Sequence, residues 1–443
     1  MPSNQPSRPT GTTDLGGLVI AAASSGCGLT TVCAAILRAL CQTGRGAAGA
    51  KAGLDPGPTL LQSRATGRGA YNLDTWAMRP ETRAALLADA YGDSDLLLIE
   101  GSDGLFDGDA AGLGATADLA EELALPVVLL IDAQGLTHSV AALIEGFARH
   151  RNTLPIAAVI LNRVAGPAHE TLLRQALQST GTPVLGAIPE APELALPTQS
   201  EAFLDGAAAV IARSLDLSAL AALAQPVRLP AEPAEDPGLA APGHHLAIAR
   251  DQAFAPLYPH LLDAWRVQGV ELSFFSPLAD EAPAPAADVI WLPGSPAPSG
   301  LAPETFDSLV QAKAFRTGLQ AAAADRRHIY GEGSGFMLLG ESLLDSKGLE
   351  HPLLGLLPLR FALPTRRTLP GRQALTLSSP GLWGKLGTRL RACAWEDAVL
   401  RWQGLGEPLF QAFTPLGDAL GPAGIARDRV AGSLLRLVDR NTP

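Results

Sequence analysis

The first half of the chain alternates between short apolar runs and longer amphipathic stretches. The apolar runs are bounded by turn residues, which is typical of parallel strands buried on both faces. They are LGGLVIAAA (Leu15 to Ala23), DLLLIEG (Asp95 to Gly101), LPVVLLIDA (Leu125 to Ala133) and IAAVILNRV (Ile156 to Val164). The stretches between them place apolar residues at three-to-four spacing, as amphipathic helices do. The alternation predicts a doubly wound α/β domain with a parallel, P-loop-type sheet over residues 15–223.

A proline-rich segment separates this domain from a second one. Residues 224–245 combine proline, alanine and acidic residues, and proline stiffens extended connections that lack regular structure. We therefore predict an interdomain linker there. Beyond it the rhythm of strands and turns resumes, which predicts a second α/β domain over residues 246–443. The first 14 residues are polar and rich in Pro, Ser and Thr, so we expect a disordered leader.

Composition and charge narrow the class of protein. The 443 residues are 47% hydrophobic and 17% charged, which is ordinary for a folded protein. The net charge of −11 argues against a dedicated nucleic-acid binder, because phosphate neutralisation requires a basic face. No apolar run approaches ~18 residues, so we predict no membrane span. Four cysteines without paired spacing, and no signal-peptide pattern, lead us to expect a cytoplasmic protein.

The segment SSGCGLTT (Ser24 to Thr31) follows the first predicted strand and opens the first predicted helix. Small residues at such a junction let backbone N–H groups converge on a phosphate, and a hydroxyl there can hold magnesium. The candidate nucleotide-binding residues of this loop are Ser25, Gly26, Gly28, Thr30 and Thr31. Leu29, however, stands where such loops carry a lysine for the phosphates. A tight strand-to-helix turn without a ligand explains the glycines equally well, so both interpretations stay open.

Charged side chains follow two other predicted strands. Lys51 and Asp55 lie in AKAGLD, and Glu100 and Asp107 lie in LIEGSDGLFDG. Ligands and magnesium bind at the carboxyl ends of parallel strands, so we expect Lys51 to contribute to the nucleotide site. The candidate Mg²⁺ ligands are Thr30, Asp55 and Glu100. Solvated charges at strand ends are the alternative interpretation.

Several motifs occur in an order that points to one family. They are SSGCGLTT, KAGLD, ATGRGAYNLDTWAM, LIEGSDGLFDG, VVLLIDAQGLTHSVAALIEGF, AAVILNRV and PVLGAIPE, followed by FSPLADE, VIWLPGS and IYGEGSGFMLLGESLL. The set resembles cobyrinic acid a,c-diamide synthase, a glutamine-dependent amidotransferase family of cobalamin biosynthesis. The resemblance implies a dethiobiotin-synthetase-like P-loop domain and a class I glutamine amidotransferase domain. It further implies that ATP activates a tetrapyrrole carboxylate as an acyl phosphate, which ammonia released from glutamine then attacks.

The synthetase half departs from the family's pattern at charged positions. The family's phosphate-loop lysine falls on Leu29. Its GPDYxD segment, followed by histidine, is replaced by GLDPGPTLLQ, which keeps Asp55 but places Gln62 at the histidine position. We therefore expect nucleotide binding to be weak or lost.

The glutaminase half departs from the pattern at its reacting groups. The cysteine of the family's nucleophile elbow falls on Gly333 in GEGSG, and without the sulfur no thioester with glutamine can form. The family's catalytic histidine falls at or near Arg436, and no histidine follows His351. The oxyanion-hole stretch is replaced by PGSPAPS (Pro293 to Ser299), where proline removes a backbone donor. We predict that glutamine hydrolysis is absent.

These departures lead to one hypothesis and two alternatives. The leading hypothesis is a catalytically degenerate, non-catalytic member of the family that binds a tetrapyrrole or serves as a partner or scaffold. The first alternative is an ATP-dependent ligase that uses free ammonia, or ammonia from another subunit, with Lys51 replacing the lost charge. The second is a collapsed cleft in a protein that works through its surface. The expected cofactors are MgATP, weakly bound or lost, and a tetrapyrrole, and the expected partner is a second copy or an active amidase paralogue.

Overall fold

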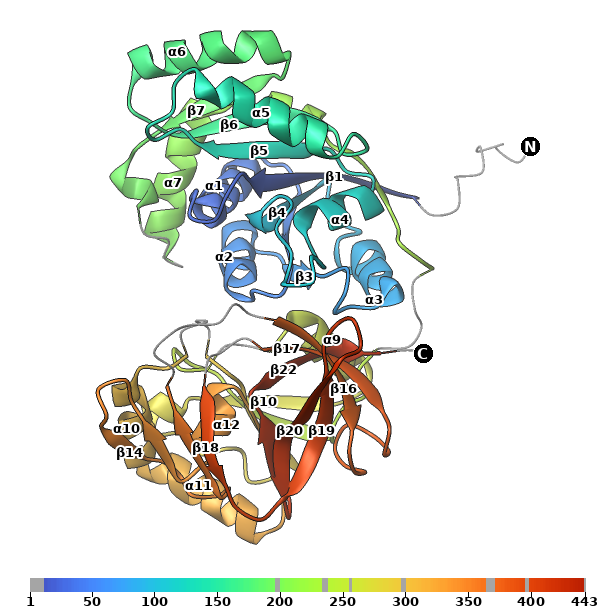
Figure 1. Cartoon of the computed structure of the whole chain (residues 1–443), viewed down its shortest axis with the longest axis vertical. Coiled ribbons are helices and arrows are strands. Elements are labelled where there is room, and N and C mark those ends of the chain that lie inside the picture. The colour runs from blue at the N-terminus through green and yellow to red at the C-terminus, as the bar shows by residue number, and fades with distance from the viewer. Residues whose placement is uncertain are drawn as a thin grey trace, which may run out of the picture. The chain divides into compact units, whose positions relative to one another are not determined.

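The computed structural model divides the chain into two units (Figure 1). The described residues are 12–195, 200–232, 238–254, 257–295, 300–363, 371–394 and 398–441. The N-terminal unit comprises Met1–Thr75, Pro80–Gly108 and Gly112–Ala234, and the C-terminal unit comprises Trp76–Arg79, Asp109–Ala111 and Glu235–Pro443. Two short segments from within the first predicted domain thus belong to the second unit. One of them contains Trp76, and the guanidinium carbon of Arg391 lies 4.1 Å from the centre of its ring. Residues so distant in sequence are joined by packing that no local pattern encodes.

The N-terminal unit is built on one sheet with the strand order β3-β2-β4-β1-β5-β6-β7, and β8 pairs with β1. The strands are β1 (Thr12–Ala22), β2 (Ala47–Ala52), β3 (Tyr71–Leu73), β4 (Leu96–Gly104), β5 (Val127–Asp132), β6 (Ile156–Val164), β7 (Val184–Pro189) and β8 (Gln225–Arg228). The helices are α1 (Leu29–Gln42), α2 (Gly57–Thr66), α3 (Pro80–Ala85), α4 (Thr116–Glu122), α5 (Ser139–His150), α6 (Pro167–Leu177), α7 (Glu201–Ser214) and α8 (Leu217–Ala222), with short helical turns η1 (Leu86–Ala90), η2 (Gln178–Thr180) and η3 (Pro192–Leu194). All pairs except β1–β8 are parallel, which confirms the predicted doubly wound α/β domain.

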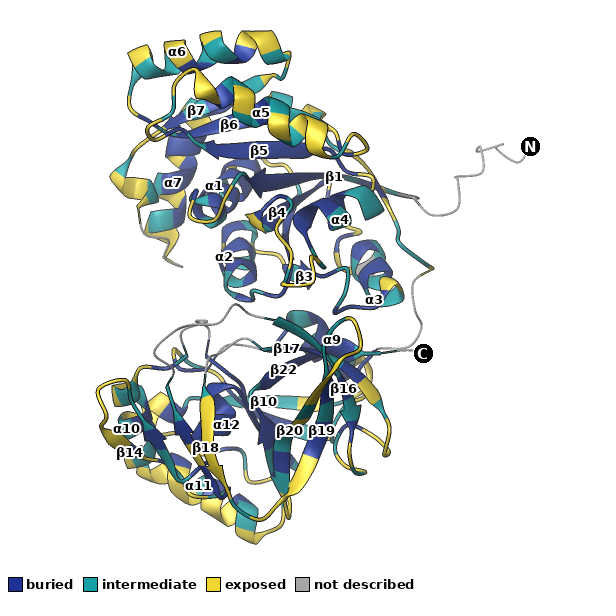
Figure 2. Cartoon of the chain, in the orientation of Figure 1, coloured by how far each residue is buried: buried dark blue, intermediate teal, exposed yellow. Residues whose placement is uncertain are grey.

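Alternate residues of each central strand enter two separate cores. Leu18 and Ile20 of β1 pack with residues of α1, α2, α7 and α8. Val19 and Ala21 of the same strand pack with residues of α4, α5 and α6. Figure 2 shows the central strands as buried and the outer turns of α5 and α6 as exposed. The continuous apolar runs in the sequence therefore reflect a sheet covered by helices on both faces.

The ends of the first domain differ from the expected boundaries. Strand β1 begins at Thr12, inside the segment predicted as a leader, because Thr12 pairs with Arg228 of β8. Strand β8 in turn takes up residues predicted as linker. Residues 1–11 and 233–237 lie outside the described residues, so the disorder expected of the leader stays a prediction.

The C-terminal unit contains a mixed sheet and a smaller second sheet. The large sheet has the order β10-β9-β11-β12-β21-β20-β19-β16-β17-β22, and the small one β14-β13-β15-β18. The strands are β9 (His245–Ala249), β10 (Glu271–Phe275), β11 (Val289–Leu292), β12 (His328–Glu332), β13 (Ser342–Leu344), β14 (Glu350–Pro352), β15 (Leu359–Ala362), β16 (Gly371–Leu377), β17 (Arg389–Ala394), β18 (Val399–Gln403), β19 (Glu407–Phe413), β20 (Ala419–Arg427), β21 (Val430–Ser433) and β22 (Leu435–Arg440). The helices are α9 (Pro259–Val267), α10 (Pro303–Gln311), α11 (Lys313–Ala324) and α12 (Ser334–Leu338), with a short turn η4 (Pro277–Ala279).

The direction of the strands changes across the large sheet. Neighbours from β10 to β21 are parallel, whereas those from β21 to β22 are antiparallel. The α/β class is thus confirmed for this unit, and the doubly wound pattern describes its parallel part. None of the helices in the described parts of the chain is long and apolar enough to span a bilayer.

Tyr91 provides a test of the packing of the N-terminal unit. Its hydroxyl is fully buried, donates to the Gly49 carbonyl at 3.1 Å and accepts from the Tyr71 amide at 3.0 Å. Tyr91→Phe leaves both backbone groups of neighbouring strands without that partner. We expect the free energy of unfolding, measured by urea denaturation, to fall by about 1–3 kcal/mol. An unchanged free energy would contradict the buried position of the hydroxyl.

Candidate functional site

The segment SSGCGLTT forms the connection between β1 and α1. Gly26 and Gly28 have φ angles of 83° and 80°, left-handed values that favour glycine. Gly28 directly precedes the first turn of α1. Ser25 is exposed, whereas Thr31 is buried. The structure therefore places the predicted loop residues together at a strand-to-helix junction.

Leu29 is the first residue of α1, and its side chain faces inward. It is 9% exposed and belongs to the core that α1 shares with one face of the sheet. Apolar packing accounts for this position. The side chain brings no positive charge to the loop.

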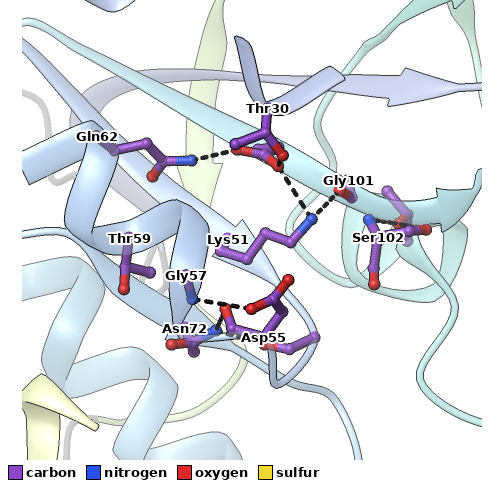
Figure 3. Close-up of polar contacts among 12 residues, drawn as sticks. Thr30, Lys51, Asp55, Gly57, Thr59, Gln62, Asn72, Gly101 and Ser102 are labelled. Atoms are coloured by element: carbon purple, nitrogen blue, oxygen red, sulfur yellow. Dashed lines mark hydrogen bonds and ion pairs between the residues drawn. The ribbon is translucent and has the colours of Figure 1, made fainter. Parts of the chain in front are cut away.

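Glu100 is the middle residue of β4, which continues past the predicted strand end to Gly104. It is fully buried, and both oxygens of its carboxylate are engaged. Thr30 Oγ1 donates to Glu100 Oε1 at 2.6 Å, and Lys51 Nζ lies 3.2 Å from the same oxygen. Gln62 Nε2 donates to Oε2 at 2.7 Å. Lys51 also donates to the Gly101 carbonyl. Side chains from α1, β2 and α2 thus converge on one carboxylate, as Figure 3 shows for Thr30, Lys51 and Gln62.

The charges of Lys51 and Glu100 compensate each other. The two side chains are 6% and 0% exposed, so each depends on the other and on hydrogen bonds for the hydration it has lost. The ammonium group that could replace the missing loop lysine is consequently committed to Glu100 and Gly101. Because Glu100 compensates the positive charge of Lys51, the pair attracts a phosphate only weakly.

The predicted magnesium ligands are only partly brought together. Thr30 and Glu100 contact each other directly, whereas Asp55 Oδ1 accepts from Gly57 N at 2.8 Å within its own turn (Figure 3). Asp107 Oδ2 likewise accepts from the nearby Gly104 amide at 3.0 Å. Among the described residues, no group of three or more His, Cys, Asp or Glu side chains is arranged to hold a metal.

Two residues that the sequence analysis missed hold the loop from β6. Asn162 Nδ2 donates to the Cys27 carbonyl at 2.7 Å, and an Arg163 guanidinium nitrogen donates to the Gly26 carbonyl at 2.9 Å. Arg163 also pairs with Asp132 at 2.6 Å. Both residues lie at the carboxyl end of a predicted strand, which is the signal that identified Glu100. Gln62 lies inside a helix and carried no such signal.

In the C-terminal unit, Gly333 connects β12 to α12 through a sharp turn. Its φ and ψ are 49° and −121°, a conformation that other residues adopt only under strain. The neighbouring glycines allow a close approach of backbone, since a Cβ on Gly335 would lie 2.1 Å from the Leu292 carbonyl oxygen. Ser334 is fully buried at the start of α12. The turn thus has the backbone of an elbow but no side chain at its tip.

Arg436 occupies the predicted histidine position on β22. It is 3% exposed, and its guanidinium donates to the Ser295 carbonyl at 2.9 Å. The neighbouring Leu437 amide donates to Glu332 Oε1 at 3.0 Å. A guanidinium stays protonated in proteins and cannot act as a general base. Residues 296–299 of the predicted oxyanion stretch lie outside the described residues.

Comparisons with known proteins agree with this two-part organisation. Residues 18–202 match the model of the CobQ/CobB/MinD/ParA nucleotide binding domain, and residues 245–383 match that of the CobB/CobQ-like glutamine amidotransferase domain. A hydrogenobyrinate a,c-diamide synthase of Rhizobium meliloti is 41% identical over 438 residues, which cover 96% of this chain and 99% of the relative. The chain belongs to the a,c-diamide synthase family. Relatives of the same name from Brucella anthropi and Rhodobacter capsulatus are 41% and 38% identical, over 96% and 95% of this chain and 98% of each relative.

Family membership confirms the predicted P-loop-type domain followed by an amidotransferase-like domain. It also shows that the resemblance extends past the N-terminal motifs to nearly the whole chain. Leu29, Gly333 and Arg436 therefore lie on an a,c-diamide synthase framework.

The Lys51–Glu100 pair leads to a prediction about stability. Lys51→Met leaves the Glu100 carboxylate buried without its cation, so we expect the free energy of unfolding to fall by about 3–5 kcal/mol. The double variant Lys51→Met/Glu100→Gln removes both charges and should recover most of that loss. Urea denaturation of the three proteins measures both effects. Equal stability of the wild type and the single variant would mean that the pair is solvated.

A pair of glycine variants tests the elbow. Gly333→Ala forces a side chain into a strained conformation, and we expect it to lower the free energy of unfolding by about 1–3 kcal/mol. Gly146 lies inside α5, where an added Cβ meets nothing within 4 Å. The control Gly146→Ala should therefore raise stability by about 0.5–1 kcal/mol. A Gly333→Ala protein as stable as the wild type would contradict the elbow geometry.

Proposed function

We propose that this chain is a non-catalytic member of the a,c-diamide synthase family, which binds a tetrapyrrole and does not hydrolyse glutamine. The observation that carries the proposal is Gly333. The elbow keeps the backbone conformation suited to a nucleophile, yet no sulfur or oxygen stands at its tip. Covalent attack on glutamine requires such a group.

The occupant of the histidine position supports the loss of glutaminase chemistry. Arg436 is bonded to the Ser295 carbonyl, at the start of the stretch that would supply oxyanion donors. A permanently protonated side chain in this place can neither accept the proton of a nucleophile nor return it to ammonia. Both observations support the proposal that the described part of the unit lacks a nucleophile and its base.

The synthetase site fits MgATP only in part. The glycines of the loop fit a phosphate, whereas Leu29 is packed in the core and Lys51 is neutralised by Glu100. Glu100 already accepts from Thr30 and Gln62. A magnesium ion would have to displace internal partners from a carboxylate that is fully buried, which adds a cost to nucleotide binding.

The proposed ligand follows from the relatives. They are named for hydrogenobyrinate, and they align with this chain over almost its full length. We therefore propose that the retained fold binds a tetrapyrrole of that type. A second copy, or an intact family member, is the proposed partner, because it would supply the chemistry that this chain lacks.

One observation favours a second function, an ATP-dependent amide ligase that receives ammonia from elsewhere. Thr30, Lys51 and Glu100 converge beside the phosphate loop, as such an enzyme requires. In this alternative the nucleotide displaces part of the network, and Lys51 turns from Glu100 toward the phosphates.

Calorimetric titration with MgATP separates the two functions. We expect no binding heat and no effect of ADP for the wild type. A dissociation constant at or below about 100 μM, about 5.5 kcal/mol of binding free energy, would favour the ligase. In that case the double variant Lys51→Met/Glu100→Gln, which keeps the site neutral, should abolish the binding.

Two further assays test the leading proposal directly. We expect no release of ammonia from glutamine, with the Rhizobium meliloti relative assayed in parallel as the active control. Hydrogenobyrinate should bind, as measured by a change in its absorbance spectrum on titration with the protein. Failure to bind hydrogenobyrinate would contradict the proposed ligand, and glutamine hydrolysis would contradict the non-catalytic assignment.

A further inference from the structure

The C-terminal unit contains a pocket of about 450 Å³ at the amino ends of β12 and β21, the ends remote from Gly333. It is formed where the turn between α11 and β12 meets the turn between β20 and β21. Strands β12 and β21 pair in parallel, with Ile329 beside Val430, so the turns that precede them lie at the same end of the strands. Gly333 follows the opposite end of β12, roughly 15 Å away at the rise of a strand. The pocket is thus separate from the elbow.

The lining of the pocket combines positive charge with an apolar wall. Arg326 comes from the first turn, and Arg427 and Arg429 come from the second. Asp428 is the acidic residue among the lining residues, so three arginines face one carboxylate. The apolar part of the lining consists of Ala323, Leu356 and Val430, with Gly355 beside them.

Two of the arginines have no internal partner. No hydrogen bond or ion pair to any described residue is made by the side chains of Arg326 and Arg427. Arg429 donates to Nε2 of His328. Burial and the charge of Arg429 lower the pKa of His328, so the imidazole stays neutral and accepts from Arg429. Two guanidinium groups therefore remain available to an anion.

Simple structural roles explain only part of this arrangement. A basic residue such as Arg326 near the C-terminus of α11 is favoured by the helix dipole. That effect does not account for Arg427, which comes from another turn of the chain. The chain as a whole carries a net charge of −11, so a concave site with excess positive charge stands out from its surface.

We propose that this pocket binds a small organic molecule with at least two anionic groups, phosphate or carboxylate. Arg326 and Arg427 pair with the anionic groups through their planar donor pairs. The carbon framework of the molecule lies against Leu356 and Val430. This inference does not depend on whether the chain binds a tetrapyrrole.

Calorimetric titrations of the full chain at low ionic strength with pyrophosphate and with citrate test the proposal. Binding of pyrophosphate alone identifies a phosphate ligand, and binding of citrate alone identifies a carboxylate ligand. The variant Arg326→Ala/Arg427→Ala should weaken the observed binding at least about tenfold, since each lost arginine removes charge-assisted hydrogen bonds. Binding of neither probe would overturn the proposal.

The matched control is Arg389→Ala/Arg401→Ala. It removes the same charge from exposed positions of β17 and β18 in the same unit. We expect this control to leave the affinity for the probes unchanged. A loss of affinity equal to that of Arg326→Ala/Arg427→Ala would show that the probes respond only to the net charge of the protein, and it would overturn the proposal. If the first double variant fails to fold, Arg427→Lys keeps the charge but loses the planar donor pair. It should weaken binding several-fold, and unchanged binding would overturn the proposal.

Discussion

The carboxylate of Glu100 is the constraint on which the N-terminal unit depends. It is fully buried in the middle of β4, and its oxygens are bound by Thr30, Lys51 and Gln62. Replacing one member of such a cluster leaves the others buried without a partner, which lowers the free energy of unfolding. Replacing all of them together lowers it far less. The network therefore has a structural role that does not depend on catalysis. Its presence beside the loop is weaker evidence for catalysis than the charge of its residues suggests.

The same separation between framework and chemistry occurs in the C-terminal unit. The turn at Gly333 keeps a demanding conformation because β12 and α12 must be joined across a close backbone approach at Gly335. That packing constrains the backbone at Gly333 to angles at which any side chain is strained. Arg436 on β22 donates to the Ser295 carbonyl, and its guanidinium stays protonated. In both units the backbone geometry at these positions follows from packing and does not depend on a reacting group.

The sequence by itself determined the class of fold and the places where chemistry belongs. Apolar runs such as Leu125 to Ala133 identify buried parallel strands, because neither face of a strand covered on both sides contacts solvent and both therefore carry apolar residues. The position of Glu100 directly after such a run predicted its place beside the loop that holds Thr30, although β4 itself continues to Gly104. The absence of a thiol at Gly333 was also determined, since no fold can supply a missing atom.

Only the tertiary structure decided how the charges are used and where the units divide. Lys51 and Glu100 are 49 residues apart, and nothing local indicates that their charges cancel in the interior. Asp55 has the right residue type for a metal ligand, yet its turn engages the carboxylate. The pocket of Arg326 and Arg427 arises from the parallel pairing of β12 and β21. Pairing between distant segments depends on the packing of the whole sheet, which local patterns of hydrophobic and polar residues do not encode.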